Sequence, residues 1–372
     1  MRRGDYFASI PESPADVERL WRGATPLDGT TCPNWLPASE SHAYRAIELD
    51  VNCRRVGRER DAYSRELDTL AAAGLFVDED SGRYHRVFVA APLKWSIGIY
   101  KGDSPFSFGS PNDVTNPVLT RESVSDVVAS FVADPFMLHV GQRWFMFFEV
   151  MNWRANKGEI GLATSEDGLT WRYERIVLAE AFHLSYPYVF VWKNDYYMVP
   201  ESYQSGEIRL YRATRFPLEW ACVGTLLKGA YLVDPSVIHH EGMWWLFTEA
   251  SRARRHDTLE LYYSGDLLGP WQPHPQNPIV AGNPCAARPA GRVIVHEGRV
   301  VRYAQSCVPE YGTEVRAFEL TELTAHSYQE READRVLYPT NAGWNAHGMH
   351  HLDPHRQADR HWIACVDGWT RC

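Results

Sequence analysis

Acidic side chains recur at a fixed spacing along this chain, and they are the residues best suited to acid–base chemistry. Three strand-like segments carry a proline near their start, and 15 residues separate the residue before that proline from a later glutamate. Carboxylates that lie close together raise one another's pKa, so that one can act as an acid while another stays ionised. Enzymes that cleave glycosidic bonds use such pairs. At this spacing Asp134 stands with Glu149 and Asp234 stands with Glu249. In the remaining pair, Tyr186 stands with Glu201.

An internal repeat indicates which elements position these side chains. Five segments share one plan, in which a short strand, a polar turn and an aromatic-rich strand follow one another. The first three prolines lie 52 and 48 residues apart, and each of these units continues with a further strand candidate and a tryptophan. Four strands per unit at this period are typical of a β-propeller blade. The sequence therefore predicts an all-β, five-bladed β-propeller with hairpins at 133–149, 185–201, 233–249, 287–305 and 348–367.

Propeller geometry then predicts which residues meet. The first strand of each blade lines the axis and the second runs back, so the start of one and the end of the other face the same end of the channel. In the fourth and fifth units the two positions are 17 residues apart. We expect one face of the ring to gather five inner residues and five surrounding ones. These are Asp134, Tyr186, Asp234, Arg288 and His350 inside, with Glu149, Glu201, Glu249, Gln305 and Asp367 around them.

The two ends of the chain have different predicted roles. Few residues follow the fifth hairpin, so we expect the segment 86–100 to supply one or two outer strands of the last blade and close the ring. Closure of this kind removes exposed sheet edges. Residues 1–85 differ in pattern, because SPADVERLW and SRELDTLAAAGLF are typical of short helices. We therefore expect a small α-rich extension over 1–85 and a propeller over 86–372.

Composition excludes several classes of protein. The chain has 372 residues, 47 acidic against 38 basic and a net charge of −9, which argues against nucleic acid or an acidic membrane as the main partner. It has no apolar run of the roughly 18 residues that span a bilayer, and its first residues lack the apolar core of a secretory signal. Seven scattered cysteines without a CxxC pair favour reduced thiols in a cytoplasm.

Aromatic residues make up 13% of the chain, and the repeat assigns most of them to packing between blades. This includes the three tryptophans that follow the hairpins, Trp171, Trp220 and Trp271. A smaller set is expected near the mouth of the channel, where the rings could stack on a sugar. These rings are Tyr186, Tyr188 and Trp344.

Each candidate side chain also has a structural interpretation. An aspartate before a proline can cap a turn, and the glutamates could bond to backbone groups between blades. Arg288 could belong to a buried ion pair, or it could bind a phosphate or carboxylate, in which case the ligand is anionic. The histidine-rich segment 345–355 lacks the helical HExxH spacing of a catalytic zinc site. His350 could instead hold a hydrated divalent ion in the axial channel or polarise a substrate hydroxyl.

A series of motifs resembles a known group of proteins. The blade starts ADPF and VDPS look like those of the five-bladed propellers of glycoside hydrolase families 43, 32 and 68. More narrowly, the chain over about 92–370 resembles the propeller-like N-terminal region of glucosamine inositolphosphorylceramide transferases and their bacterial relatives. That resemblance rests on WSIGIY, NPVLT, ADPF, FFE, KGEIGLATSEDGLTW, FHLSYPYVF, YMVPES, ARPAGR and YG, in this order.

The resemblance to the hydrolases implies roles for individual residues. Their base or nucleophile, an aspartate in the opening strand of the first blade, matches Asp134. A second aspartate, which positions substrate and tunes the acid, matches Asp234, and a histidine that coordinates an axial calcium matches His350. Their general acid has no counterpart, because Arg288 stands at that position.

Two functions of different class follow from these observations. The first is a carbohydrate-active enzyme, glycosidase- or glycosyl-transfer-like, that acts on a glycoside or an anionic sugar derivative and needs no cofactor beyond a possible axial calcium ion. Glu201 or Glu249 would then supply the proton. The second is a non-catalytic sugar-binding propeller, or a companion of a separate glycosyltransferase. A propeller repurposed for acid–base chemistry in biosynthesis is a third alternative.

Overall fold

We describe a computed structural model of the chain, which divides into two compact units. The first unit is Met1–Lys94 with Arg371–Cys372, and the second is Trp95–Thr370. The structure describes residues 93–229, 231–251 and 255–371 in full. Upstream it describes the backbone of 15, 19, 21–22, 25–26, 44–50, 75–78 and 84–90.

The described part of the first unit is mainly an antiparallel sheet. Its four strands have the order β1-β2-β4-β3, with bounds β1 Thr25–Pro26, β2 Tyr44–Asp50, β3 Leu75–Asp78 and β4 Tyr84–Ala90. Of the two predicted helices, the first includes the helical residues 15, 19 and 21, whereas the second ends inside β3 and otherwise lies outside the described residues. The rest of the α-rich extension expected over 1–85 lies outside the described residues, and the described strands form a sheet that the sequence analysis did not predict. Runs of β-branched and aromatic residues such as RVFVA favour strands there.

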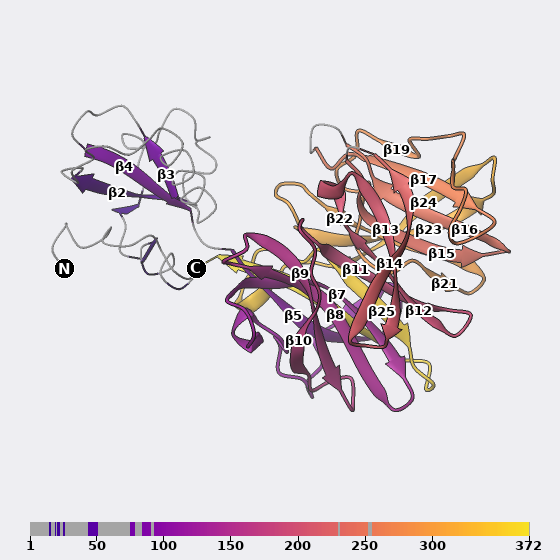
Figure 1. Cartoon of the computed structure of the whole chain (residues 1–372), viewed down its shortest axis with the longest axis horizontal. Coiled ribbons are helices and arrows are strands. Elements are labelled where there is room, and N and C mark those ends of the chain that lie inside the picture. The colour runs from indigo at the N-terminus through magenta and orange to yellow at the C-terminus, as the bar shows by residue number, and fades with distance from the viewer. Residues whose placement is uncertain are drawn as a thin grey trace. The chain divides into compact units, whose positions relative to one another are not determined.

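The second unit is a five-bladed β-propeller, as predicted (Figure 1). Blade 1 has the order β10-β9-β8-β7, blade 2 β11-β12-β13-β14 and blade 3 β15-β16-β17-β18, with β19 added to β17. The bounds in blade 1 are β7 Ala129–Val140, β8 Arg143–Asn152, β9 Lys157–Ser165 and β10 Arg172–Leu178. Those in blade 2 are β11 Ser185–Trp192, β12 Asp195–Glu201, β13 Glu207–Arg215 and β14 Glu219–Lys228. Those in blade 3 are β15 Val233–His240, β16 Met243–Glu249, β17 Thr258–Ser264, β18 Gln272–Pro273 and β19 Val280–Ala281.

The last two blades complete the ring. Blade 4 has the order β20-β22-β23-β24, with β21 also paired to β22, and blade 5 has the order β25-β26-β5-β6. The bounds in blade 4 are β20 Arg288–Pro289, β21 Ile294–His296, β22 Arg299–Ser306, β23 Glu314–Leu323 and β24 Tyr328–Leu337. Those in blade 5 are β25 Leu352–Arg356, β26 Trp362–Arg371, β5 Leu93–Ser104 and β6 Ser107–Gly109. Contacts between β25 and β7 join blade 5 to blade 1.

The ring is closed by strands from both ends of the sequence. Strand β5 is hydrogen-bonded to β26, so the prediction that an early segment completes the last blade is confirmed. The contribution begins at Leu93, however, because the preceding strand Tyr84–Ala90 belongs to the sheet of the first unit. The second unit accordingly begins at Trp95.

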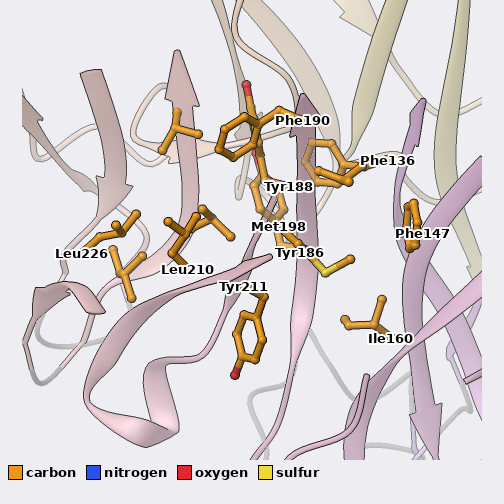
Figure 2. Close-up of a cluster of buried hydrophobic side chains, with 14 of the residues drawn as sticks. Phe136, Phe147, Ile160, Tyr186, Tyr188, Phe190, Met198, Leu210, Tyr211 and Leu226 are labelled. Atoms are coloured by element: carbon orange, nitrogen blue, oxygen red, sulfur yellow. The ribbon is translucent and has the colours of Figure 1, made fainter. Parts of the chain in front are cut away.

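Aromatic rings fill the spaces between blades, and this explains most of their excess. Figure 2 shows one such cluster, in which Phe136 and Phe147 of blade 1 lie near Tyr186, Tyr188 and Phe190 of blade 2. The tryptophans that follow the hairpins also pack in the blades, and each donates its ring N–H to a carbonyl in the preceding turn.

The first strands of blades 1 to 3 share an unusual backbone conformation at one position. Asp134, Tyr186 and Asp234 have φ values of 53°, 46° and 50°, and each precedes a proline. The pairing with the second strand shifts register at the same place in all three blades. Left-handed backbone is strained for such side chains and is concentrated at functional sites. A bulge changes the direction of a side chain, here at the position that the repeat predicted to face the mouth of the channel.

Candidate functional site

One cavity of about 350 Å³ opens where the predicted inner and surrounding residues meet. Five of the ten predicted residues line it: Asp134, Glu149, Glu201, Arg288 and His350. The other five do not line it and are buried: Tyr186, Asp234, Glu249, Gln305 and Asp367. The repeat therefore identified the correct end of the propeller, although five of the ten residues that it predicted are buried and do not line the cavity.

Asp134 is the carboxyl of blade 1 at the axis, and neighbouring backbone and side chains hold it in place. Its Oδ2 accepts the N–H of Tyr186 at 3.2 Å, and its own N–H donates to Asp367 Oδ2 at 2.9 Å. Burial is the main cause that raises the pKa of Asp134 to about 7, where His350 opposes and Asp367 reinforces the shift. A carboxyl with that pKa exchanges protons near neutral pH, as a general base must.

His350 bridges Asp134 and Asp367. Its Nδ1 lies 2.7 Å from Asp367 Oδ1, and its Nε2 lies 3.6 Å from Asp134 Oδ1. Burial lowers the pKa of His350, but the charge and hydrogen bond of Asp367 outweigh it and the net pKa is raised. The pKa of Asp367 is lowered because the charge and hydrogen bond of His350 overcome the opposite effect of burial. The cluster thus places an imidazole with a raised pKa between two carboxyl groups.

The same three residues are the described side chains with the spacing of a metal site. One ligand atom from each of Asp134, His350 and Asp367 lies within 4.8 Å of the others. These three side chains alone do not fit the calcium expected at His350, since calcium takes six to eight oxygen ligands and the set offers two carboxylates and one imidazole nitrogen. No step below is routed through a metal ion.

Arg288 forms a buried ion pair, which is one of the two roles that the sequence suggested for it. Its Nε donates to Asp234 Oδ2 at 2.6 Å, and Gln305 donates to the same oxygen at 3.3 Å. The guanidinium also lies 3.0 Å from His256 Nδ1 and stacks over the ring of Tyr311 at 5.0 Å. An anionic ligand would have to compete with Asp234 for this arginine.

The glutamates at the ends of the second strands lie in three different environments. Glu201 is hydrogen-bonded to Asp234 and lies 3.8 Å from Arg288, and burial followed by the charge of Asp234 raises its pKa. Glu249 is fully buried and does not line the cavity, which argues against its expected role as a proton donor. Glu149 lines the cavity beside His183, with 3.5 Å between Glu149 Oε1 and His183 Nε2.

The rings expected at the mouth lie elsewhere. Tyr186 and Tyr188 are 1% and 2% exposed and belong to the core, and Trp344 packs against another buried cluster. The backbone at Tyr186 matches that at Asp134, which does line the cavity, so spacing alone did not reveal that the tyrosine ring packs in the core. The rings that do line the cavity are Trp95, Phe131, Tyr203, Tyr231 and Tyr311.

Two histidines of the cavity were missed by the sequence analysis. His183 precedes strand β11, and His256 lies between β16 and β17. Both are outside the repeated hairpins, so their positions have no equivalent in other blades. The only available signal for His183 was its place in FHLSYP, next to the predicted mouth residue Tyr186.

With the fold and cavity described, comparisons with known proteins assign the family. The family model for the N-terminal region of glucosamine inositolphosphorylceramide transferase 1 matches residues 91–369. The chain belongs to this family. The resemblance found in the sequence motifs is thereby confirmed, and the matched residues coincide with the propeller.

Two relatives are named glucosamine inositolphosphorylceramide transferase 1. The protein of Oryza sativa subsp. japonica is 39% identical over 298 residues, and that of Arabidopsis thaliana is 38% identical over 296 residues. Each match covers 74% of this chain but only 40% and 39% of the respective relative. The chain therefore spans about two fifths of their length.

A solved structure shares the propeller fold of this family. The β-1,2-mannobiose phosphorylase of Listeria innocua, in complex with β-1,2-mannobiose, matches with a TM-score of 0.53 at 12% identity. The match covers 72% of this chain and 96% of that one. In the part of the chain that the structure describes, no helix is long and apolar enough to cross a membrane.

Proposed function

We propose that the propeller is a carbohydrate-active enzyme that cleaves or transfers a glycosidic bond in the cavity. The observation that carries this proposal is the convergence of Asp134, Glu149 and Glu201 on one cavity of about 350 Å³. Such chemistry needs one carboxyl as base or nucleophile and another that keeps its proton. Burial raises the pKa of Asp134 to about 7 and that of Glu149 well above its usual range.

In this proposal Asp134 is the base or nucleophile. His350 and Asp367 hold its carboxyl in place from one side, and the Tyr186 N–H holds it from the other. Asp234 orients Arg288 in the wall instead of touching the ligand. The rings of Tyr203, Tyr231 and Trp95 provide apolar surface against which a sugar ring can pack.

Family membership supports a carbohydrate ligand, since its relatives are named as glucosamine inositolphosphorylceramide transferases. A second candidate is a non-catalytic sugar-binding propeller, which is favoured by the Arg288–Asp234 ion pair at the place where a hydrolase-like site would hold its acid. In both candidates the ligand is a sugar or a sugar derivative that binds in the same cavity.

The test is a screen of aryl and methyl glycosides and sugar phosphates with the wild-type protein and the variant Asp134→Asn. We expect turnover of at least one glycoside, with a loss on the order of 100-fold or more in the variant. The matched control Asp195→Asn, at a half-exposed position, should retain full turnover. Calorimetric binding without any product would instead favour the non-catalytic candidate.

A further inference from the structure

Glu149 differs from the other carboxyls of the cavity in having no cationic partner. Burial is the main cause that raises its pKa, and the charges of Asp134, Glu201, Asp234 and Asp367 raise it further. Among the described residues its one ion-pair neighbour is His183, at 3.5 Å. Because burial lowers the pKa of His183 to about 4, that ring is neutral at pH 7. Among the residues that the structure describes, no cationic side chain pairs with an ionised Glu149.

The hydrogen bonds of His183 determine which way its proton points. Its Nδ1 accepts the backbone N–H of Gly158 at 2.9 Å, so the neutral ring carries its proton on Nε2. That nitrogen faces Glu149 Oε1. The contact of 3.5 Å favours Oε1 as the acceptor of this N–H, which leaves Oε2 to carry the acid proton of Glu149.

Gly158 is the residue that permits this arrangement. A Cβ at this position would lie 2.2 Å from the Leu184 carbonyl oxygen, 2.8 Å from Glu149 Oε1 and 2.9 Å from His183 Cε1. The backbone of β9 can therefore approach both side chains only if the residue is glycine. Leu184 N–H donates to Gly158 O at 3.0 Å and fixes the loop that carries His183.

Glu201 is the competing candidate for a proton donor, and its partners are different. Its carboxyl is hydrogen-bonded to Asp234, which keeps its proton inside the wall, and Arg288 lies 3.8 Å away. A proton held between two buried carboxyls is not directed at a ligand. The positive charge of Arg288 also favours the ionised form of Glu201.

We propose that Glu149 donates the proton to the leaving group, and that His183 and Gly158 position it; this rests on the proposed glycosidic activity. The proton on Glu149 Oε2 moves to the glycosidic oxygen as the bond from that oxygen to the anomeric carbon breaks, and the bonding electrons stay on the oxygen. Asp134 either takes a proton from the water molecule that attacks the anomeric carbon, or attacks that carbon itself and forms a glycosyl ester. In the first case Asp134 releases its proton to solvent and Glu149 takes one up. In the second case a water molecule hydrolyses the ester and gives its proton to Glu149.

The first experiment compares leaving groups. The variant Glu149→Gln is assayed on 2,4-dinitrophenyl and methyl glycosides of glucose, mannose, galactose and N-acetylglucosamine. We expect a loss of about 100-fold or more with methyl glycosides and less than about 10-fold with dinitrophenyl glycosides, because dinitrophenolate leaves without a proton. Glu201→Gln is the matched comparison and should lose turnover equally on both, and the exposed Glu166→Gln should lose none.

An equal loss on both leaving groups in Glu149→Gln, or a selective loss in Glu201→Gln, would overturn the assignment. These results differ from failure of the proposed function, in which the wild-type protein turns over no glycoside at all. In that case the donor role of Glu149 is also excluded.

The second experiment separates positioning from folding. His183→Leu should lower kcat on methyl glycosides about 10-fold, leave KM unchanged and spare the dinitrophenyl glycosides. His183→Gln, whose amide N–H can replace Nε2–H, should restore most of kcat. If each of the two variants lost as much turnover on dinitrophenyl glycosides as on methyl glycosides, and Gln restored nothing, His183 would have no positioning role. Thermal unfolding of each variant shows whether the fold is retained.

Discussion

His351 is a histidine that the fold keeps uncharged. It is completely buried, its ring contacts Phe136 and Tyr186 edge to face, and neither ring nitrogen has a hydrogen-bond partner in the described structure. Burial lowers its pKa to about 4, whereas an exposed histidine has a pKa near 6.5. Below pH 6.5 the unfolded chain binds a proton that the folded chain does not, so this residue destabilises the fold increasingly as the pH falls toward 4.

We predict the size of this effect from the difference in pKa. One such group costs about 2 kcal/mol of stability between pH 7 and pH 5. The variant His351→Leu should therefore lose less stability over this interval than the wild-type protein, measured by urea unfolding at both pH values. Asp134, whose pKa is raised, acts with the opposite sign, so only the difference between the two proteins is informative. The control is His326→Leu, at an exposed position. If His351→Leu and the wild-type protein lost the same stability between pH 7 and pH 5, the prediction would be contradicted.

At the scale of elements, the first strand of blade 2 is tied to blades 3 and 4 by one hydroxyl group. Tyr186 Oη accepts the N–H of Gly291 at 2.5 Å and lies 2.8 Å from Ser236 Oγ. Arg292 adds a second tie, because it pairs with Asp353 of blade 5 and donates to the carbonyl of Val189. Strands around the axis are thus joined by side chains as well as by packed rings.

We predict that Tyr186→Phe destabilises the propeller by about 1–3 kcal/mol, because the buried N–H of Gly291 loses its acceptor. The measurement is the shift of the denaturant midpoint at constant slope. Tyr338→Phe removes a hydroxyl from a ring that is 55% exposed and should leave the midpoint nearly unchanged. Equal midpoints for both variants would show that the hydroxyl of Tyr186 does not stabilise the axis.

At the scale of the whole molecule, the propeller has its own cores and its own closure. Its clusters of buried side chains lie within Trp95–Thr370, which also forms one compact unit. We predict that a chain beginning at residue 91 unfolds cooperatively like the full chain, whereas one beginning at residue 105 does not, because it lacks β5. Circular dichroism during heating distinguishes the two. Cooperative unfolding of the shorter chain would show that β5 is dispensable.

The repeat made it possible to predict the propeller and the end of the ring at which the cavity opens. Equivalent positions in successive blades face the same end of the axis, so spacing alone brought Asp134, Glu149 and Glu201 together. Spacing did not reveal the direction of each side chain: Tyr186 has the same left-handed backbone as Asp134, yet its ring packs in the core while Asp134 lines the cavity.

Other parts of the site were not predictable for different reasons. His183 and His256 lie outside the hairpins and have no counterpart in other blades, so no periodicity marks them. The pairing of Arg288 with Asp234 joins residues of two blades and follows from their distance in space, not from sequence separation. In the N-terminal unit, local helix signals competed with β-branched runs that form β3 and β4.

The closure of blade 5 has a consequence for how fast the protein folds. Strand β5 must wait for β26, which follows it after about 250 residues, before its edge is paired. Contacts between such distant segments carry a large loop-closure entropy and slow folding. Blades 1 to 4 are each formed from contiguous strands, so we expect the docking of β5 onto β26 to be the slow step. Until then one edge of β5 is unpaired, and unpaired strand edges promote aggregation.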